Sequence, residues 1–501
     1  MDPTEGVDLR EAAGEQAAYV TKLAPDGTYR WTRTADGQDP GPFFPDNAGA
    51  SGVVSTTRGI VLVVGSFAGT VDFDPGKGVD ERTVIGDGNA FIWTFDQDGA
   101  YIGTVIFGTR SGIGQSGANP RGIALDPDEN ILIAGLWAGE LDFDPGPDHD
   151  RHQSPKNVNV FVTKFLADGS YGWTRTFGGF GWDEATGVAA DAGGNVLVTG
   201  NFRGSPDFDP TDGVDVHSAQ VHPQNIFVTK LGPDGSYRWT RTLPAWDTWS
   251  RRNITVDPGG NAYVASTFEG TVDLDPTDGE DWRTANDDAT STSTGDAFVT
   301  RINADGSYGW TYTAGGARFD QASGVGVHQQ VGVAMAGSFQ DEVDFDPGPG
   351  TDIHTGLEPG FITALGFDGA YRWTRSFGHN GSAIVYDVTM APDGAIIPVG
   401  RAIGTVPFDG AVDFNPGCAP EVRLIPSGPK WYINKLICVE ASADADGNGF
   451  INLRDYAVLQ NCFTGPAPTV CSKGCEAFDF DHTDDIDLPD LTPVVDAVTG
   501  P

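Results

Sequence analysis

The chain carries few positive charges for its size. Its 501 residues include 30 Lys and Arg against 70 Asp and Glu, which gives a formal net charge of −40. Nucleic acids and anionic membrane surfaces repel a polyanion, so we expect neither as a partner. The sequence also lacks any run of about 18 apolar residues, so we expect no membrane insertion.

Cysteine is scarce and confined to one end of the chain. All 5 cysteines lie after residue 417: Cys418, Cys438, Cys462, Cys471 and Cys475. We expect one or two disulfides and an oxidising compartment, with unpaired thiols as the alternative. No signal peptide is visible, but Met1 falls inside a repeat. We therefore expect a truncated start and an extracellular or cell-surface location.

Motifs of recognised catalytic chemistry are also missing. The 8 His form no His-x-His or His-Glu-x-x-His zinc spacing. No Gly-x-Ser-x-Gly elbow, phosphate-binding loop or dinucleotide fingerprint occurs in a strand-to-helix context. A catalytic pair cannot be singled out among so many acids. The sequence therefore favours a non-catalytic protein.

What the chain has in abundance is a repeat. The stretch Val71-Asp72-Phe73-Asp74-Pro75 returns at 141–145, 206–210, 272–276, 343–347 and 412–416, a spacing of about 65 to 71 residues. Eight residues after its first Asp stands an acid, and ten residues after it an Arg or His. The acids are Asp80, Asp150, Asp215, Asp281, Asp352 and Glu421, and the bases are Arg82, His152, His217, Arg283, His354 and Arg423.

Four strand-like segments accompany each copy. One resembles Phe161-Val162-Thr163-Lys164-Phe165, and an Asp-Gly pair such as Asp168-Gly169 follows it, which is a strong hairpin signal. The next strand carries a Trp in most copies, which we interpret as an anchor between neighbouring sheets. Strands of small and β-branched residues complete the unit, and no helical period competes.

Four short antiparallel strands in each repeat of this length are typical of propeller blades, which bury their faces against neighbouring blades. The order Phe-Val-Thr-Lys-Leu, Asp-Gly-Ser-Tyr-x-Trp and Val-x-x-Asp-x-x-Gly-Asn-x-x-Val resembles the SBBP-type β-propeller repeat family over residues 18–436. The resemblance implies an all-β fold of extracellular type without assigned catalytic residues. We expect six four-stranded blades within residues 1–436, closed by strands 18–34 joining the sheet of 386–401, with seven as the alternative.

The recurring Asp-x-Asp-Pro motif has two interpretations. Asp207, Asp209 and Asp215 could converge on calcium. Alternatively, the motif is an Asx-type turn with Asp215 and His217 paired on one strand face. Repetition in every blade favours the structural interpretation, because a catalytic site normally breaks the symmetry.

The composition changes after Leu436. Residues 437–501 contain two stretches with oxygen-bearing groups at the spacing of EF-hand calcium loops, each followed by a short helical pattern. They resemble a type I dockerin module, which implies a small α-helical domain, two Ca2+ ions and a cohesin-like protein partner. The chain departs from the family pattern in two ways: Leu453-Arg454 and Leu488-Pro489 replace the small hydroxyl residues that contact a cohesin, and Asp484 stands where the second loop is expected to have Gly. The expected ligands are Asp444, Asp446, Asn448, Phe450 (through its carbonyl), Asn452 and Asp455, and Asp479, Asp481, Thr483, Asp485, Asp487 and Asp490.

These features together predict a secreted or surface binding scaffold with a calcium-dependent docking module. The irregular segments at 38–47, 180–184, 245–252 and 318–321 vary between repeats and are the expected recognition loops. Trp182, Trp246 and Trp249 in them would suit polysaccharide stacking. Two alternatives stay open, a polysaccharide-acting enzyme with its site in the propeller funnel and a structural surface-layer component.

Overall fold

The structure, a computed structural model, describes residues 17–25, 27–37, 47–110, 117–154, 157–219, 224–245, 254–286, 295–378, 382–392, 394–404, 411–413, 422–424 and 428–433. The chain divides into two compact units, one of residues 1–388 and 398–433, the other of 389–397 and 434–501. The described residues form strands and turns and contain no helix, so none that could cross a membrane. The predicted helical module after residue 436 lies outside them and stays a prediction.

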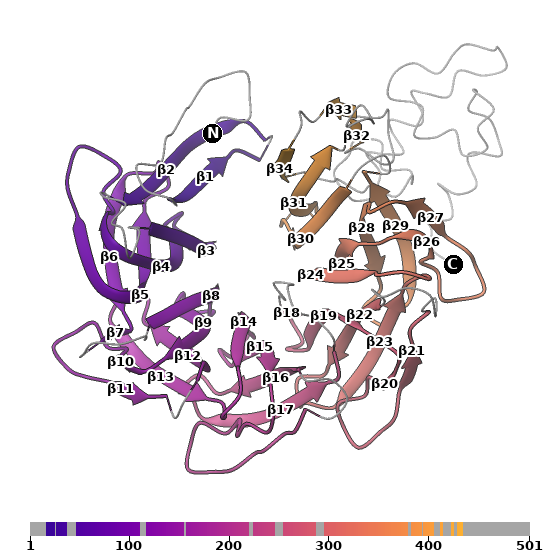
Figure 1. Cartoon of the computed structure of the whole chain (residues 1–501), viewed down its shortest axis with the longest axis horizontal. Helices are drawn as coiled ribbons and strands as arrows, with labels where there is room; N and C mark the ends of the chain where they lie inside the picture. The colour runs from indigo at the N-terminus through magenta and orange to yellow at the C-terminus, as the bar shows by residue number, and fades with distance from the viewer. Residues whose placement is uncertain are drawn as a thin grey trace, which may run out of the picture. The chain divides into compact units, whose positions relative to one another are not determined.

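Five antiparallel sets of four strands follow one another along the chain, and we call them blades 1 to 5 (Figure 1). Within each blade the strands pair in chain order. The blades are β3 (Asn47–Ser55), β4 (Val61–Asp72), β5 (Glu81–Phe95) and β6 (Tyr101–Phe107); β8 (Gly117–Leu125), β9 (Ile131–Ala138), β12 (Asn159–Phe165) and β13 (Tyr171–Phe177); β14 (Glu184–Ala190), β15 (Val196–Phe202), β16 (Asn225–Leu231) and β17 (Tyr237–Leu243); β18 (Ile254–Val256), β19 (Ala262–Phe268), β22 (Asp296–Ile302) and β23 (Tyr308–Ala314); and β24 (Gln321–His328), β25 (Gly332–Ser338), β28 (Gly360–Leu365) and β29 (Tyr371–Phe377).

The two central strands of a blade are buried on both faces. Every residue of β12, β15 and β16 is buried, whereas most residues of the outer strand β13 are half-buried and only Thr174 and Phe177 are buried. Because the third strand is buried on both faces, its sequence has residues such as Val, Phe and Thr and does not alternate between apolar and polar side chains. The Asp-Gly turn that follows it holds Gly169 at φ 84°, a backbone conformation that disfavours other residues.

The remaining strands form partial sheets. β1 (Ala18–Leu23) and β2 (Tyr29–Gly37) belong to the sheet of blade 1, and β30 (Ser382–Met390), β31 (Ile396–Gly404) and β34 (Gly428–Ile433) form a three-stranded sheet. The described pairings do not include the expected closure, in which residues 18–34 join the sheet of 386–401, and that closure stays a prediction. β31 pairs with β34, which has the third-strand pattern, while β1 pairs with β2.

The long insertion between second and third strands is a hairpin. The structure forms it in each of blades 1 to 5, and we call these insertions the acidic hairpins, residues 72–82, 142–152, 207–217, 273–283 and 344–354. In blade 1 the hairpin continues β4 and β5, and in blade 3 isolated bridges replace strands. Its strands elsewhere are β7 (Thr109–Arg110) with β10 (Glu140–Asp142) and β11 (Arg151–Gln153), β20 (Thr271–Asp273) with β21 (Trp282–Thr284), β26 (Asp341–Asp344) with β27 (Ile353–Gly356), and β32 (Ala411–Asp413) with β33 (Val422–Leu424).

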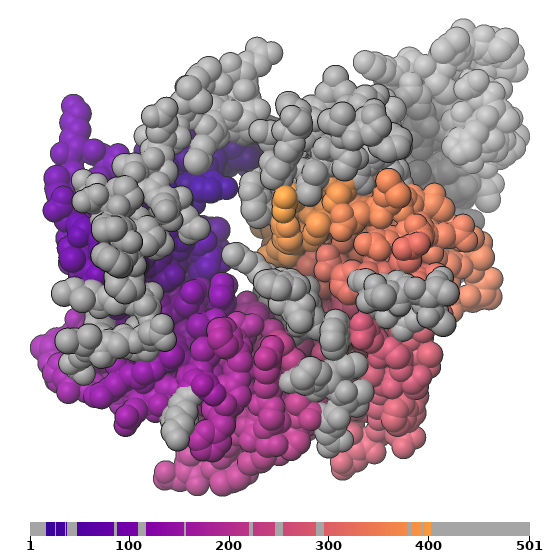
Figure 2. All heavy atoms as spheres, in the orientation of Figure 1, coloured from indigo at the N-terminus to yellow at the C-terminus, as the bar shows by residue number. Residues whose placement is uncertain are grey.

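The apolar core lies between consecutive blades. One cluster joins Leu62 and Ile92 of blade 1 to Ile133 and Phe161 of blade 2, and three similar clusters join the later blades pairwise. Figure 2 shows the atoms of successive sheets as adjoining bands of colour. Because each blade buries its faces only against its neighbours, the array depends on every junction.

The recurring Trp is an anchor between blades, as predicted. The indole N–H of Trp173 in blade 2 donates to the carbonyl of Pro233 in blade 3 at 3.1 Å. Trp310 in blade 4 donates to Phe367 in blade 5 at 2.9 Å. The ring covers the next Asp-Gly turn so closely that a Cβ added to Gly369 would lie 2.7 Å from Trp310. Glycine is therefore required there by space as well as by φ.

Arginine two residues after the Trp completes this contact. The Arg175 guanidinium lies 5.5 Å from the centre of the Trp173 ring and donates through Nε to the Gly235 carbonyl at 3.0 Å. Arg33 and Arg241 donate to Gly99 and Gly306 in the same way, each at 2.6 Å. The Trp ring, the Arg guanidinium and the turn carbonyls of the next blade thus form one recurring contact, which we call the Trp-x-Arg contact.

We predict that Trp310→Ala lowers the free energy of unfolding by about 2 to 4 kcal/mol, because it removes ring packing and a hydrogen bond at a blade junction. Trp282→Ala is the control, since that side chain is 59% exposed and should change stability by less than about 0.5 kcal/mol. Denaturant unfolding measures both. Equal losses would show that Trp310 does not anchor the junction.

Candidate functional site

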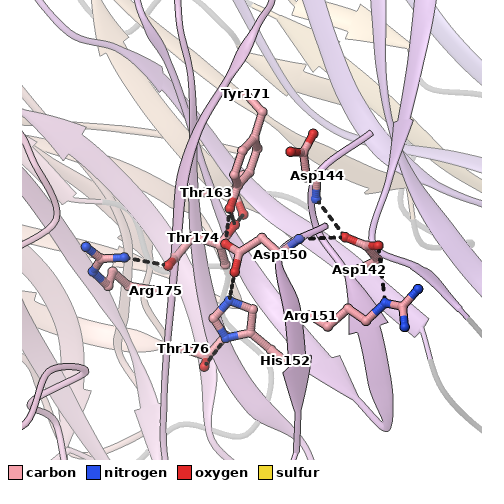
Figure 3. Close-up of polar contacts among 10 residues, drawn as sticks. All are labelled: Asp142, Asp144, Asp150, Arg151, His152, Thr163, Tyr171, Thr174, Arg175 and Thr176. Carbon is pink, nitrogen blue, oxygen red and sulfur yellow. Dashed lines mark hydrogen bonds and ion pairs between the residues drawn. The ribbon is translucent and has the colours of Figure 1, made fainter. Parts of the chain in front are cut away.

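The acidic hairpins carry the densest recurring set of polar side chains, and the first Asp of each organises its loop. In blade 3, Asp207 Oδ1 accepts the backbone N–H of Asp209 at 3.1 Å and that of Asp215 at 2.8 Å. In blade 2, Asp142 accepts from Asp144 and Asp150 in the same way (Figure 3). The equivalent bonds recur in the other three blades. One carboxylate oxygen therefore closes a loop of nine residues.

The second Asp forms an Asx turn. Asp209 Oδ1 accepts the N–H of Thr211 at 2.8 Å, while a Cβ added to Gly213 would lie 2.1 Å from its Oδ2. Glycine occupies this crowded position in four of the five hairpins. Both oxygens of the second Asp therefore face the main chain of its own turn.

The third acid joins the hairpin to the outer strand of its own blade. Asp150 pairs with His152 at 3.1 Å and accepts a hydrogen bond from the Tyr171 hydroxyl of β13 (Figure 3). His152 also contacts the Thr176 hydroxyl at 3.0 Å. The predicted pairing of acid and base is confirmed in all five blades.

The tyrosine of this contact is a residue that sequence reasoning missed. It stands two residues after each Asp-Gly turn, at Tyr101, Tyr171, Tyr237, Tyr308 and Tyr371, and each hydroxyl donates to the third acid. Burial, followed by the hydrogen bond to the neighbouring carboxylate, raises the pKa of Tyr171 far above its usual range. The phenol therefore stays a donor. Its fixed spacing from the Asp-Gly pair was the available signal.

The hairpin also reaches the preceding blade through its main chain. Asp142 and Leu141 pair with Thr109 and Arg110, which follow the outer strand of blade 1. The N–H of Gly178, after the outer strand of blade 2, donates to the Asp207 carbonyl at 3.3 Å. Asp72 and Val71 pair likewise with Asp36 and Gly37. The hairpins of blades 2 and 3 therefore each connect two blades, and that of blade 1 connects β2 to its own sheet.

The repeated motif is thus a structural turn, in agreement with the favoured interpretation. Its three acids accept hydrogen bonds from the backbone, a base and a tyrosine. Across the described residues, no group of three or more His, Cys, Asp or Glu side chains is arranged to hold a metal ion. The motif places polar groups where they join blades.

We predict that Asp207→Ala lowers the free energy of unfolding by about 1 to 3 kcal/mol, because it leaves two partly buried N–H groups without their acceptor. Asp207→Asn keeps an acceptor oxygen and should cost less than half as much. Thermal or denaturant unfolding of the two variants measures the difference. If both cost the same, the charge rather than the acceptor geometry stabilises the loop.

Two buried aspartates, Asp183 and Asp320, each accept backbone hydrogen bonds from two consecutive blades. Asp320 is 1% exposed and accepts the N–H of Gly316 at 2.6 Å and that of Gln340 at 2.9 Å. Asp183 holds Gly179 and Arg203 in the same arrangement. Burial raises the pKa of Asp320 to about 8, with a smaller contribution from the Asp296 and Asp341 charges, although the two N–H bonds oppose it. Burial also raises the pKa of Asp183.

We predict that the Asp320 carboxyl contributes stability that is lost as pH rises between about 4 and 8. Unfolded Asp320 loses its proton near 3.8, whereas the folded state keeps it up to about 8, so the folded state binds more protons in this window. Asp320→Asn should flatten the dependence, and the exposed Asp98→Asn should leave it unchanged. Chemical unfolding at several pH values measures the slopes. Identical slopes in all three proteins would contradict the assignment.

The calcium ligands predicted between Asp444 and Asp490 all lie outside the described residues, and so do Trp246 and Trp249. Two expected recognition loops are described. Phe180 and Trp182 are 77% and 49% exposed, and Arg318 pairs with Asp341 at the surface. Exposed aromatic side chains therefore do occur in the loop between β13 and β14.

Comparison with other proteins supports the repeat character. No family model matches the chain. An uncharacterized WD repeat-containing protein, L264, of Acanthamoeba polyphaga mimivirus is 25% identical over 182 residues, which cover 32% of this chain and 13% of that protein. A solved protein of unknown function from Bacteroides caccae aligns with 74% of this chain and 94% of its own, at 10% identity and a TM-score of 0.32.

The match to the viral protein spans only a small part of that protein's length. Taken with the all-β sheets described above, it defines this chain as a repeat protein of β-propeller-like architecture.

Proposed function

We propose that the chain is a non-catalytic, extracellular binding scaffold of the SBBP-type propeller class. Its six blades would comprise the five four-stranded ones and the sheet of β30, β31 and β34. In this function the repeated elements are structural, and the positions that differ between repeats recognise the ligand.

The observation that carries this proposal is the uniform use of polar groups in the acidic hairpins. In five successive blades the first Asp accepts the same backbone N–H groups, and the third acid accepts from the same base and tyrosine. Asp207 with Asp215 and Asp273 with Asp281 are examples. Polar side chains that make the same structural hydrogen bonds in every repeat are unsuited to form a single catalytic site. The exposed aromatic side chains of Phe180 and Trp182, by contrast, belong to one loop alone.

The remaining part of the proposal concerns residues 437–501, the dockerin-like module. Two clusters of acids there, from Asp444 to Asp455 and from Asp479 to Asp490, have calcium-loop spacing. Bound Ca2+ would remove the repulsion among these carboxylates and order the module. The ordered module would then attach the scaffold to a cohesin-like or other protein partner, while the propeller loops contact a further ligand such as a polysaccharide.

Calorimetric titration of the full chain with Ca2+ tests this proposal. We expect two ions per chain. Asp444→Ala with Asp446→Ala should remove one of them, as should Asp479→Ala with Asp481→Ala. Asp207→Ala with Asp209→Ala, in an acidic hairpin, is the matched control and should leave two. A count that falls in the control, or no binding at all, would contradict the assignment of calcium to the module.

A further inference from the structure

The junction between blades 1 and 2 differs from the junctions on either side of it. Its outer strand β6 has Gly103 where β2, β13, β17 and β23 have Trp, and Val105 where β2, β13 and β17 have Arg. The third strand β5 has Thr94 where β12 and β16 have Lys. Blade 1 therefore lacks all three side chains that reach the turn of the next blade elsewhere.

Those side chains make specific contacts at the other junctions. Lys164 donates to the Pro233 carbonyl at 3.3 Å, in addition to the bonds from Trp173 and Arg175 already described. A Cβ on Gly235 would lie 3.1 Å from the Trp173 ring. The carbonyls before and within the Asp-Gly turn are thus hydrogen-bonded, and the face of the turn is covered.

In blade 2 the same turn is open. A Cβ added to Gly169 would meet nothing within 4 Å, and the same holds for Gly103 across the junction. Among the described residues, the carbonyls of Ala167 and Gly169 accept no hydrogen bond. These are the counterparts of the Pro233 and Gly235 carbonyls, which do.

A groove of about 560 Å³ lies at this junction, a size in the range of ligand sites. Arg82, Thr104 and Val105 line it from blade 1, and Gly169 and Tyr171 line it from blade 2. The Arg82 charge is already paired with Asp80. The tip of the blade 2 acidic hairpin adds Asp144 and Asp148 to the wall. The groove therefore combines an uncovered turn, an aromatic ring, two carboxylates and one guanidinium that is paired with Asp80.

We propose that this groove binds a basic aromatic peptide segment of a partner, one that presents an indole and a guanidinium two residues apart. The indole would cover the Gly169 turn, and the guanidinium would donate to the Gly169 carbonyl, as Trp173 and Arg175 do on Gly235. Cation–π contact between the two groups adds stabilisation, as in the Trp-x-Arg contacts within the chain. The carboxylates of Asp144 and Asp148 favour a cationic ligand.

This site is separate from the calcium-dependent docking proposed above and involves none of the same residues. Its occupant is inferred from the other junctions, of which three carry both Trp and Arg and one carries Trp310 without the Arg. The net charge of −40 further favours a positively charged segment over an anionic one.

The test is calorimetric titration of the full chain with acetyl-Trp-Thr-Arg-amide. Acetyl-Gly-Thr-Val-amide, the sequence that β6 itself carries, is the control peptide. We expect one site per chain for the first peptide and no saturable binding of the second. Gly103→Trp with Val105→Arg fills the groove from within and should weaken binding at least tenfold, while raising the thermal unfolding midpoint. Val105→Arg alone serves if the double variant does not fold.

The converse variant creates a second site. The double variant Trp173→Gly, Arg175→Val uncovers the Gly235 turn at the junction between blades 2 and 3. It should raise the number of bound peptides per chain to two. The absence of saturable binding to the unaltered chain would overturn the proposal. So would unchanged affinity in the folded variant that fills the groove, since the peptide would then bind elsewhere.

Discussion

The junction between neighbouring blades is the constraint on which the described structure depends. A single sheet cannot bury both faces of strands such as β12 and β16, so each blade requires the next one. Two devices hold the sheets together, the Trp-x-Arg contact on the following Asp-Gly turn and the acidic hairpin. In blades 2 and 3 the hairpin bonds its main chain to the preceding blade, and in all five blades its third acid bonds to the tyrosine of its own blade. Carboxylates that would repel one another at close range are thus separated and individually bonded.

The repeated parts of the described structure and the parts where the repeat is interrupted have different roles. Where the pattern repeats, as in the Asp207 and Asp273 loops, polar groups are committed to hydrogen bonds within the fold. Where the repeat pattern is interrupted, side chains and turns stay exposed and are available to bind a partner. The exposed Phe180 and Trp182 belong to one loop, and the uncovered Gly169 turn belongs to one junction. This division explains how a chain built of similar units can present distinct binding surfaces without disturbing the cores between its blades.

The sequence allowed the strands, the Asp-Gly turns and the Trp anchor to be predicted, because each depends on local periodicity or on a glycine in a turn. The pairing of Asp215 with His217 was predictable from their spacing on one strand. The role of Tyr237 was not, since its partner lies 22 residues away and only folding brings them together. The partner of β31 could not be predicted from pattern alone, because residues 428–433 and residues 18–23 carry the same third-strand pattern; among the described strands β31 pairs with 428–433. The buried Asp320 gave no signal, because its pKa depends on desolvation by neighbouring blades.

Hydrogen exchange, resolved by peptide, in the Asp207→Ala variant tests the joining of blades by the acidic hairpins most directly. The account predicts faster exchange in the hairpin at 207–217 and also at Gly178, whose N–H is bonded to the Asp207 carbonyl but belongs to the preceding blade. Protection within β15 and β16 should persist. Faster exchange confined to 207–217, with Gly178 as protected as in the unaltered chain, would contradict the account. The acidic hairpin would then be a surface loop and not a connection between blades.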